Sequence, residues 1–135
     1  MKSQIFINLP VKELEKSFNF YTKMGFANNP QFSDDSAKCM VFSEEIFVML
    51  LTHDRFKTFI SKPITDVSKT TSTLLSISVE SLDKVNEISN NAISAGGKEP
   101  IEAKDHGFMQ QRTLEDLDGH IWEIFFMDMS KFPQQ

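Results

Sequence analysis

One order of elements occurs twice along this chain, and that repeat restricts its possible folds more than any other feature of the sequence. The segment V-K-E-L-E-K at 11–16 has a counterpart in V-E-S-L-D-K at 79–84. Each opens a helical pattern, and both helical patterns end in glycine, at Gly25 and at Gly96. A repeated order of this kind indicates two modules of the same architecture.

The first repeat predicts a strand, a helix and three further strands. Residues 4–10 read Q-I-F-I-N-L-P, and Pro10 ends the strand because proline lacks an N–H. Apolar residues then recur every three or four positions from 11 to 24, which is the spacing of a helix. Short apolar runs between polar turns predict strands at 27–32, 37–42 and 46–52, followed by a short helix at 53–60.

The second repeat predicts the same order of elements. A strand is expected at 73–79, a helix at 81–95, and strands at 98–103, 108–114 and 121–126. The segment between the repeats is rich in Lys, Thr, Ser and Pro and has no periodicity. The expected organisation is a first βαβββ module with its short helix at 1–60, a linker at 61–72, a second βαβββ module at 73–128 and a C-terminal tail at 129–135.

Composition excludes several classes of partner and compartment. The chain is 40% hydrophobic and contains 13 Phe, which is enough apolar surface for a packed core. Its net charge of −5 argues against nucleic acid as a partner, since phosphate backbones require a basic surface. The single cysteine, Cys39, cannot form an intramolecular disulfide, and no apolar run is long enough to span a bilayer. We therefore expect a cytoplasmic protein with no membrane partner.

Two motifs make the repeat specific: F-Y-T-K-M-G-F at 20–26 and D-L-D-G-H-I-W-E at 116–123. With the tandem βαβββ order they resemble the vicinal-oxygen-chelate superfamily of glyoxalases, bleomycin resistance proteins and dioxygenases. Two further segments, N-L-P-V-K at 8–12 and D-H-G-F-M at 105–109, are similar to its lactoylglutathione lyase-like branch. The resemblance implies an α+β fold in which two tandem βαβββ modules form a curved mixed sheet around a central cleft, with the helices outside. It also implies a small-molecule ligand in that cleft and a homodimer.

Enzymes of this family hold a divalent metal through one inward side chain from the first and fourth strands of each module. By the resemblance, these four positions fall on Phe6, on Val48 or Leu50, on Leu74 and on Glu123. Only Glu123 can coordinate a metal, and a single carboxylate does not hold a divalent cation tightly. We therefore expect a degenerate metal site and no cofactor, with a divalent metal possible and Glu123 as its ligand only if a metal is bound.

Glu123 and His106 are the candidate catalytic residues. Strand alternation places Glu123 opposite Trp122 and Ile124, and the resemblance turns that face into the cleft. A carboxylate there can serve as a general base or accept a hydrogen bond, although it can also be a solvated strand residue. His106 stands beside Gly107 at the mouth of a strand, where a ligand can approach closely, and its plainer interpretation is a loop histidine without a role.

The expected ligand-binding residues combine apolar side chains with a few polar anchors. The apolar members favour a flat or apolar ligand. Asn8 and Ser76 can anchor it through hydrogen bonds, and Arg112 can bind a carboxylate. Core packing and hydrogen bonding within the sheet are the alternative roles. The set is Phe6, Asn8, Leu50, His53, Leu74, Ser76, Phe108, Met109 and Arg112.

These features leave three functions open. The first is a binding protein for a small, partly apolar molecule with a degenerate metal site. The second is a metal-dependent enzyme, either a glyoxalase-like lyase or a dioxygenase, that uses Glu123 with His106 or His53. The third is an antibiotic-sequestering resistance protein. The scaffold alone does not decide whether the protein is an enzyme, because one fold supports many chemistries.

Overall fold

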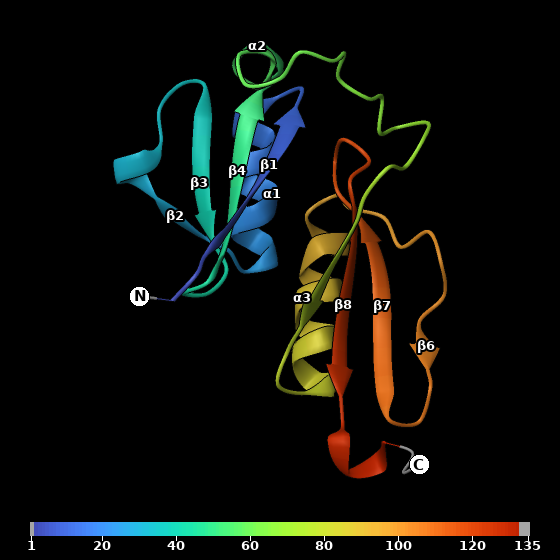
Figure 1. The fold of residues 1–135 in the computed structure, drawn as a ribbon. Coiled ribbons are helices and arrows are strands. Elements are labelled where there is room, and N and C mark those ends of the chain that lie inside the picture. The colour runs from blue at the N-terminus through green and yellow to red at the C-terminus, as the bar shows by residue number, and fades with distance from the viewer. Residues whose placement is uncertain (1, 133–135) are drawn as a thin grey trace. The chain divides into compact units, whose positions relative to one another are not determined.

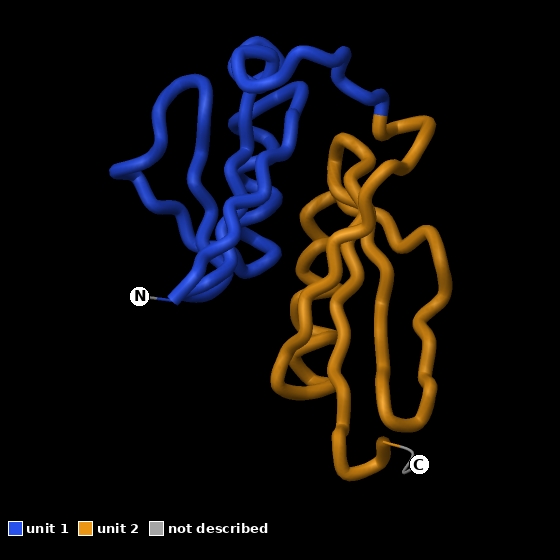
Figure 2. The backbone as a smooth tube through the Cα atoms, in the orientation of Figure 1, with its two compact units in different colours: residues 1–66 blue, residues 67–135 orange. Residues whose placement is uncertain are grey.

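The computed structural model describes residues 2–132, and two βαβββ modules follow one another along the chain (Figure 1). Each module forms its own compact unit, Met1–Asp66 and Val67–Gln135 (Figure 2). The boundary falls within the segment 61–72 that the sequence marks as a linker. The α+β class and the tandem repeat predicted from the sequence are therefore confirmed. No helix within residues 2–132 is both long and apolar enough to cross a membrane.

Unit 1 consists of a four-stranded sheet with helix α1 packed on one face. The strand order is β1-β4-β3-β2, in which β1 runs parallel to β4 and the other neighbours are antiparallel. Its elements are β1 (Ile5–Val11), α1 (Leu14–Met24), β2 (Ala27–Asn29), the 3-10 turn η1 (Pro30–Phe32), β3 (Ala37–Val41), β4 (Ile46–Thr52) and α2 (His53–Lys57).

The apolar spacing of the first helical segment produces the packing face of α1. Phe20, Tyr21 and Met24 are buried, and the Tyr21 ring packs edge-on against Phe26. The helix ends at Gly25, whose φ of 124° lies in the region that glycine adopts most easily. Its N–H donates to the carbonyls of the preceding turn.

Lys38 shows which face of the first sheet meets α1. Its Nζ lies 3.5 Å from the carboxylate of Glu15 and 5.3 Å from the ring centroid of Phe18, and both residues belong to α1. Lys38 pairs with Leu50 across β3 and β4, so Leu50 shares the α1 face and is fully buried there. Val48, two residues earlier, lies on the same face.

The expected placement of Leu50 in a ligand cleft is therefore wrong. Phe6 pairs with Phe47, so the face opposite α1 carries Phe47, Met49 and Leu51 from β4. A shift of one residue moves every side chain of a strand to the other face.

Unit 2 repeats the architecture with the strand order β5-β8-β7-β6. Again the first strand runs parallel to its neighbour and the other pairs are antiparallel. Its elements are β5 (Leu74–Ser78), α3 (Leu82–Ser94), β6 (Lys104–Asp105), β7 (Met109–Glu115), β8 (Ile121–Met127) and the 3-10 turn η2 (Met129–Lys131).

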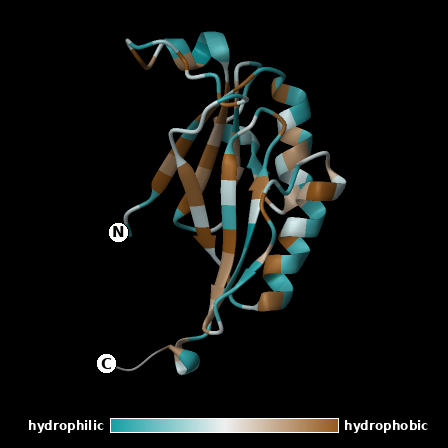
Figure 3. Ribbon diagram, turned by 90° about the vertical axis from the view of Figure 1, so that its right-hand side faces the viewer, coloured by the Kyte–Doolittle hydropathy of each residue, from teal (hydrophilic) through white to brown (hydrophobic). Residues whose placement is uncertain are grey.

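Helix α3 covers one face of the second sheet. The hydroxyl of Ser81 accepts the N–H of Lys84 at 3.0 Å and so caps the start of the helix. Apolar and polar residues are interspersed along both long helices, as the changing colours of Figure 3 show. On the sheet, Trp122 and Ile124 are buried on the face that meets α3.

Several boundaries differ from the prediction. The strand predicted at 98–103 is absent; Lys98 forms an isolated bridge to Glu115, and pairing resumes only in β6. Pro100 interrupts the segment because it has no N–H to donate. The strand predicted at 27–32 ends at Asn29, whose side chain caps η1, and α2 is shorter than the predicted helix 53–60. Within the expected tail 129–135, η2 forms, and residues 133–135 lie outside the described part.

Candidate functional site

Glu123 projects from the face of the second sheet opposite α3, as strand alternation predicts. On β5 it pairs with Ser76, and on β7 it pairs with Thr113. Side chains of one face recur at every second residue of a strand, so these neighbours form one surface. We call it the Glu123 face and define it by Leu74, Ser76, Gln111, Thr113 and Glu123.

Two neutral side chains hold the carboxylate of Glu123. Ser76 donates its hydroxyl to Oε1 at 3.0 Å, and Gln111 donates its Nε2 to Oε2 at 3.2 Å. Within residues 2–132, no Lys, Arg or His side chain forms an ion pair with Glu123. Glu123 is half-buried and Ser76 is exposed. The arrangement therefore presents an oriented, uncompensated carboxylate that can accept a further hydrogen bond or a proton.

His106 lies at the far end of this sheet from Glu123. Its backbone N–H donates to the carbonyl of Met109 at 2.7 Å, whereas Glu123 pairs with Thr113. Met109 and Thr113 are four residues apart on β7, which corresponds to about 14 Å at the usual rise of a strand. The structure does not bring the two candidate catalytic residues together.

The remaining candidates of unit 2 have different surroundings. Leu74 lies on the Glu123 face and remains 51% exposed, and Met109 shares the same face of the sheet at its other end. Phe108 packs edge-on against Phe132, with ring centroids 5.0 Å apart. This contact joins the residue before β7 to the residue after η2.

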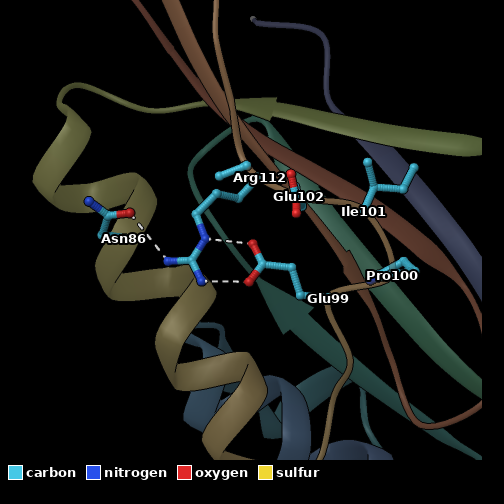
Figure 4. A pocket seen from close by; sticks show the side chains of 7 residues that line it. Asn86, Glu99, Pro100, Ile101, Glu102 and Arg112 are labelled. Atoms are coloured by element: carbon cyan, nitrogen blue, oxygen red, sulfur yellow. Dashed lines mark hydrogen bonds and ion pairs between the residues drawn. The ribbon is translucent and has the colours of Figure 1, made fainter.

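Arg112 lies on the face opposite Glu123, which contradicts the expectation that it points into a shared cleft. It pairs with Ile124, and its guanidinium binds Glu99 through two hydrogen bonds of 2.8 and 2.9 Å (Figure 4). Its Nη1 also donates to Asn86 and Asn90 of α3. These contacts occupy the guanidinium, so Arg112 ties α3 to the segment before β6.

The ion pair of Arg112 and Glu99 predicts a pH dependence of stability. Hydrogen bonding to Arg112 is the main reason that the pKa of Glu99 is lowered from its ordinary 4.5, against an opposing effect of burial. A carboxylate whose pKa is lower in the folded than in the unfolded protein stabilises the fold at pH values above its unfolded-state pKa. This stabilisation is lost as the pH falls through its folded-state pKa.

We therefore expect Glu99→Gln to cost about 1–3 kcal/mol at pH 7 and progressively less below pH ~4.5. Urea unfolding of both proteins between pH 3 and 7 measures the difference. Glu80→Gln, an exposed carboxylate of the same unit, serves as the control. A difference that stays constant over this range would contradict the assignment.

Two of the unit 1 candidates, Phe6 and Asn8, lie on the sheet face opposite α1. The Phe6 ring stacks on Phe47, with centroids 4.5 Å apart. Asn8 follows two residues later on the same face, where it pairs with Met49 and borders a cavity. His53 begins α2 and does not line that cavity.

The family model described as the Glyoxalase/Bleomycin resistance protein/Dioxygenase superfamily matches residues 4–124. The chain belongs to this superfamily. Its members often bind divalent metals and small molecules, and they often form dimers. No curated protein matches the chain.

Several solved structures share the fold of this protein. Hypothetical protein SA1046 from S. aureus is 23% identical, with a TM-score of 0.76 and coverage of 93% of this chain and 94% of that one. A glyoxalase-related enzyme from Fulvimarina pelagi is also 23% identical, with a TM-score of 0.76 and coverage of 93% and 88%. A glyoxalase/bleomycin resistance protein/dioxygenase family enzyme from Burkholderia phytofirmans PsJN is 14% identical, with a TM-score of 0.75 and coverage of 93% and 99%.

The donors on the Glu123 face do not fit the divalent metal that the superfamily implies. Glu123 supplies the only carboxylate among the five residues that define the face, and both of its oxygens accept hydrogen bonds from neutral groups. Glu115 lies on the same side of β7 but pairs with Ile121 and forms no side-chain hydrogen bond to these five residues. Its neighbours Ser76, Gln111 and Thr113 offer only neutral oxygen donors, which bind divalent cations weakly without more negative charge. Among residues 2–132, no three His, Cys, Asp or Glu side chains are grouped so as to hold a metal ion.

Sequence analysis missed two residues of the Glu123 face, Gln111 and Thr113. Both are nearly buried, although each is polar. Strand alternation separates M-Q-Q-R-T-L-E at 109–115 into two sets, but both sets contain polar side chains. The signal that identifies them is their register against Glu123, which depends on pairing with β8.

Proposed function

We propose that this superfamily member binds a small, partly apolar molecule on the Glu123 face without a divalent metal. The observation that carries the proposal is the pair of hydrogen bonds from Ser76 and Gln111 to Glu123. They fix the direction of a negative charge that no described cation neutralises. A ligand with a hydroxyl or amine hydrogen gains a charge-assisted hydrogen bond there, while the exposed Leu74 offers apolar contact.

Glu123 has a defined role in this proposal. It accepts the ligand's hydrogen, and a ligand whose acidity matches the carboxylate can transfer that proton to it. Ser76 and Gln111 act as positioning residues because they hold the carboxylate rather than the ligand. We further infer a homodimer, since the exposed apolar residues Phe6 and Leu74 lie on strands at the edges of their sheets, where a second chain can cover them.

A metal-dependent lyase or dioxygenase built on Glu123 and His106 fits the structure less well. The strand register separates the two residues by about 14 Å along β7. Because neutral groups donate hydrogen bonds to Glu123, its carboxylate is better suited to accept hydrogen bonds than to bind a metal. We therefore favour binding through hydrogen bonds and apolar contact.

Nuclear magnetic resonance with a library of small fragments tests the proposal. In the presence of EDTA, fragments with a hydroxyl or amine should shift the backbone amide resonances of Ser76, Gln111 and Glu123. Glu123→Gln should weaken their binding about 10- to 100-fold, because a hydrogen bond to a charged acceptor is lost. The control Glu80→Gln, an exposed carboxylate before α3, should leave binding unchanged.

Two results would contradict the proposal. One is a set of resonance shifts that arises only after a divalent metal is added, which would point to a metal site. The other is equal binding by the wild-type protein and Glu123→Gln, which would mean that the carboxylate takes no part.

A further inference from the structure

A second candidate site lies entirely within unit 1 and shares no residue with the Glu123 face. It is a cavity of about 350 Å³ beside α2, on the sheet face opposite α1. Helix α2 follows β4 directly and packs on β1 and β4. We call the cavity the α2 pocket and define it by Asn8, Leu51, Phe56, Phe59 and Ile60.

The walls of the α2 pocket are suited to a ring. Four of its five lining residues are apolar, and Phe56 and Phe59 are aromatic. A cavity of about 150 Å³ already accepts benzene, and ligand pockets commonly begin at about 300 Å³. The volume therefore accommodates a molecule of one or two aromatic rings, and flat rings gain from packing against Phe side chains.

Asn8 is the one polar residue among the five that line the pocket, and a hydrogen bond orients its exposed side chain. Its Nδ2 donates to the carbonyl of Phe6 at 3.2 Å. Turning the amide over would set two oxygens against each other, so the arrangement with Nδ2 toward that carbonyl is favoured. Its Oδ1 remains available, and it can only accept a hydrogen bond. A ligand that satisfies Asn8 must therefore carry a hydrogen donor.

Phe59 lies at the rim of the pocket, where the side chain of Arg55 contacts its ring. Its side chain is 64% exposed, yet the guanidinium of Arg55 lies 5.2 Å from its ring centroid. That contact favours one placement of the ring before any ligand arrives. A bound molecule would cover apolar surface on Phe59 and on the exposed Ile60.

We propose that the α2 pocket binds an aromatic molecule of one or two rings that bears a hydroxyl or amino group, with that group donating to Oδ1 of Asn8. Phe56 and Phe59 pack against the rings, and Leu51 and Ile60 complete the apolar wall. This site shares no residue with the Glu123 face and does not depend on the function proposed there, so either proposal can fail alone.

A pair of probes tests the donor requirement without any mutation. We expect 2-naphthol to bind the full chain in isothermal titration calorimetry. 2-Methoxynaphthalene, in which a methyl group replaces the donated hydrogen, should bind about 5- to 10-fold more weakly. Equal affinities, or no binding of 2-naphthol, would overturn the proposal.

Variants locate the site. Phe59→Ala should weaken 2-naphthol binding about tenfold or more, since a contacting ring is removed. Phe32→Ala is the matched control, because Phe32 is 61% exposed in the same unit but does not line the pocket. Asn8→Ala should remove the difference between the two probes. Binding that is unaffected by Phe59→Ala, or a probe difference that persists in Asn8→Ala, would overturn the assignment.

One further variant separates this inference from the proposed function. In a Glu123→Gln background, which removes the carboxylate of the other site, 2-naphthol should still bind, and Phe59→Ala should still weaken that binding about tenfold or more. If Glu123→Gln abolishes that binding and Phe59→Ala does not, the probe occupies the Glu123 face and the α2 pocket proposal is wrong.

Discussion

Replacing Gly119 with alanine is expected to destabilise the protein by about 3 kcal/mol or more. Gly119 has a φ of 112°, which side chains rarely tolerate. A Cβ built at this position would lie 2.5 Å from the carbonyl oxygen of Val67 and 3.0 Å from the Cα of Ser68. Both neighbours are backbone atoms, so relief requires movement of the chain rather than of a side chain. Thermal or urea unfolding of the variant measures the loss.

Gly107→Ala provides the matched control. Gly107 also has a positive φ, of 83°, but its added Cβ would meet nothing within 4 Å. Only backbone strain remains there, and we expect a loss of about 1–2 kcal/mol. If the two variants lose the same stability, the close approach of residues 67 and 68 to the turn contributes nothing.

Asp116→Ala is the second substitution expected to have a large effect. Oδ1 of the buried Asp116 accepts the backbone N–H groups of Asp118, Gly119 and His120, at 3.0, 2.9 and 2.8 Å. Alanine would leave these donors without their acceptor, and a buried unsatisfied donor costs about 1–3 kcal/mol. We expect a total loss of about 3 kcal/mol or more, measured by urea unfolding.

Asp116→Asn separates the hydrogen bonds from the charge. Asparagine retains a side-chain oxygen that can accept the same N–H groups, so we expect it to keep at least half of the stability that alanine loses. Similar losses of stability in both variants would show that the turn depends on the negative charge of Asp116 rather than on its acceptance of hydrogen bonds.

These two predictions assign a structural role to most of the motif D-L-D-G-H-I-W-E at 116–123. Asp116 and Gly119 shape the turn that leads into β8, and Trp122 is buried on the α3 side. Ile121 and Glu123 lie on the face of β8 opposite α3, and Glu123 is the charged member of that pair. The motif therefore places a carboxylate on an open sheet face by fixing the turn before it.

The order of the elements could be read from the sequence because it depends on local patterns. Helical spacing and closing glycines predicted α1 and α3, and the repeated order predicted two modules of one architecture. The facing of Glu123 was also predictable, since buried Trp122 and Ile124 flank it and neighbouring residues of a strand point to opposite sides.

The register between strands was decided only by the tertiary structure. In I-F-V-M-L-L-T at 46–52 both faces are apolar, so alternation could not tell that Leu50 meets α1 while Met49 shares the face of Asn8. In M-Q-Q-R-T-L-E at 109–115 both faces carry polar side chains, and only pairing with β8 turns Gln111 toward Glu123 and Arg112 toward α3.

The sequence by itself thus determined the superfamily architecture and the placement of Glu123 on the sheet face opposite the helix. The tertiary structure decided which side chains surround that residue and where a pocket forms beside α2. The physical reason is that helix and strand periods are properties of neighbouring residues, whereas a strand's partners are chosen by segments distant in the chain. A shift of one position in that pairing exchanges the two faces completely.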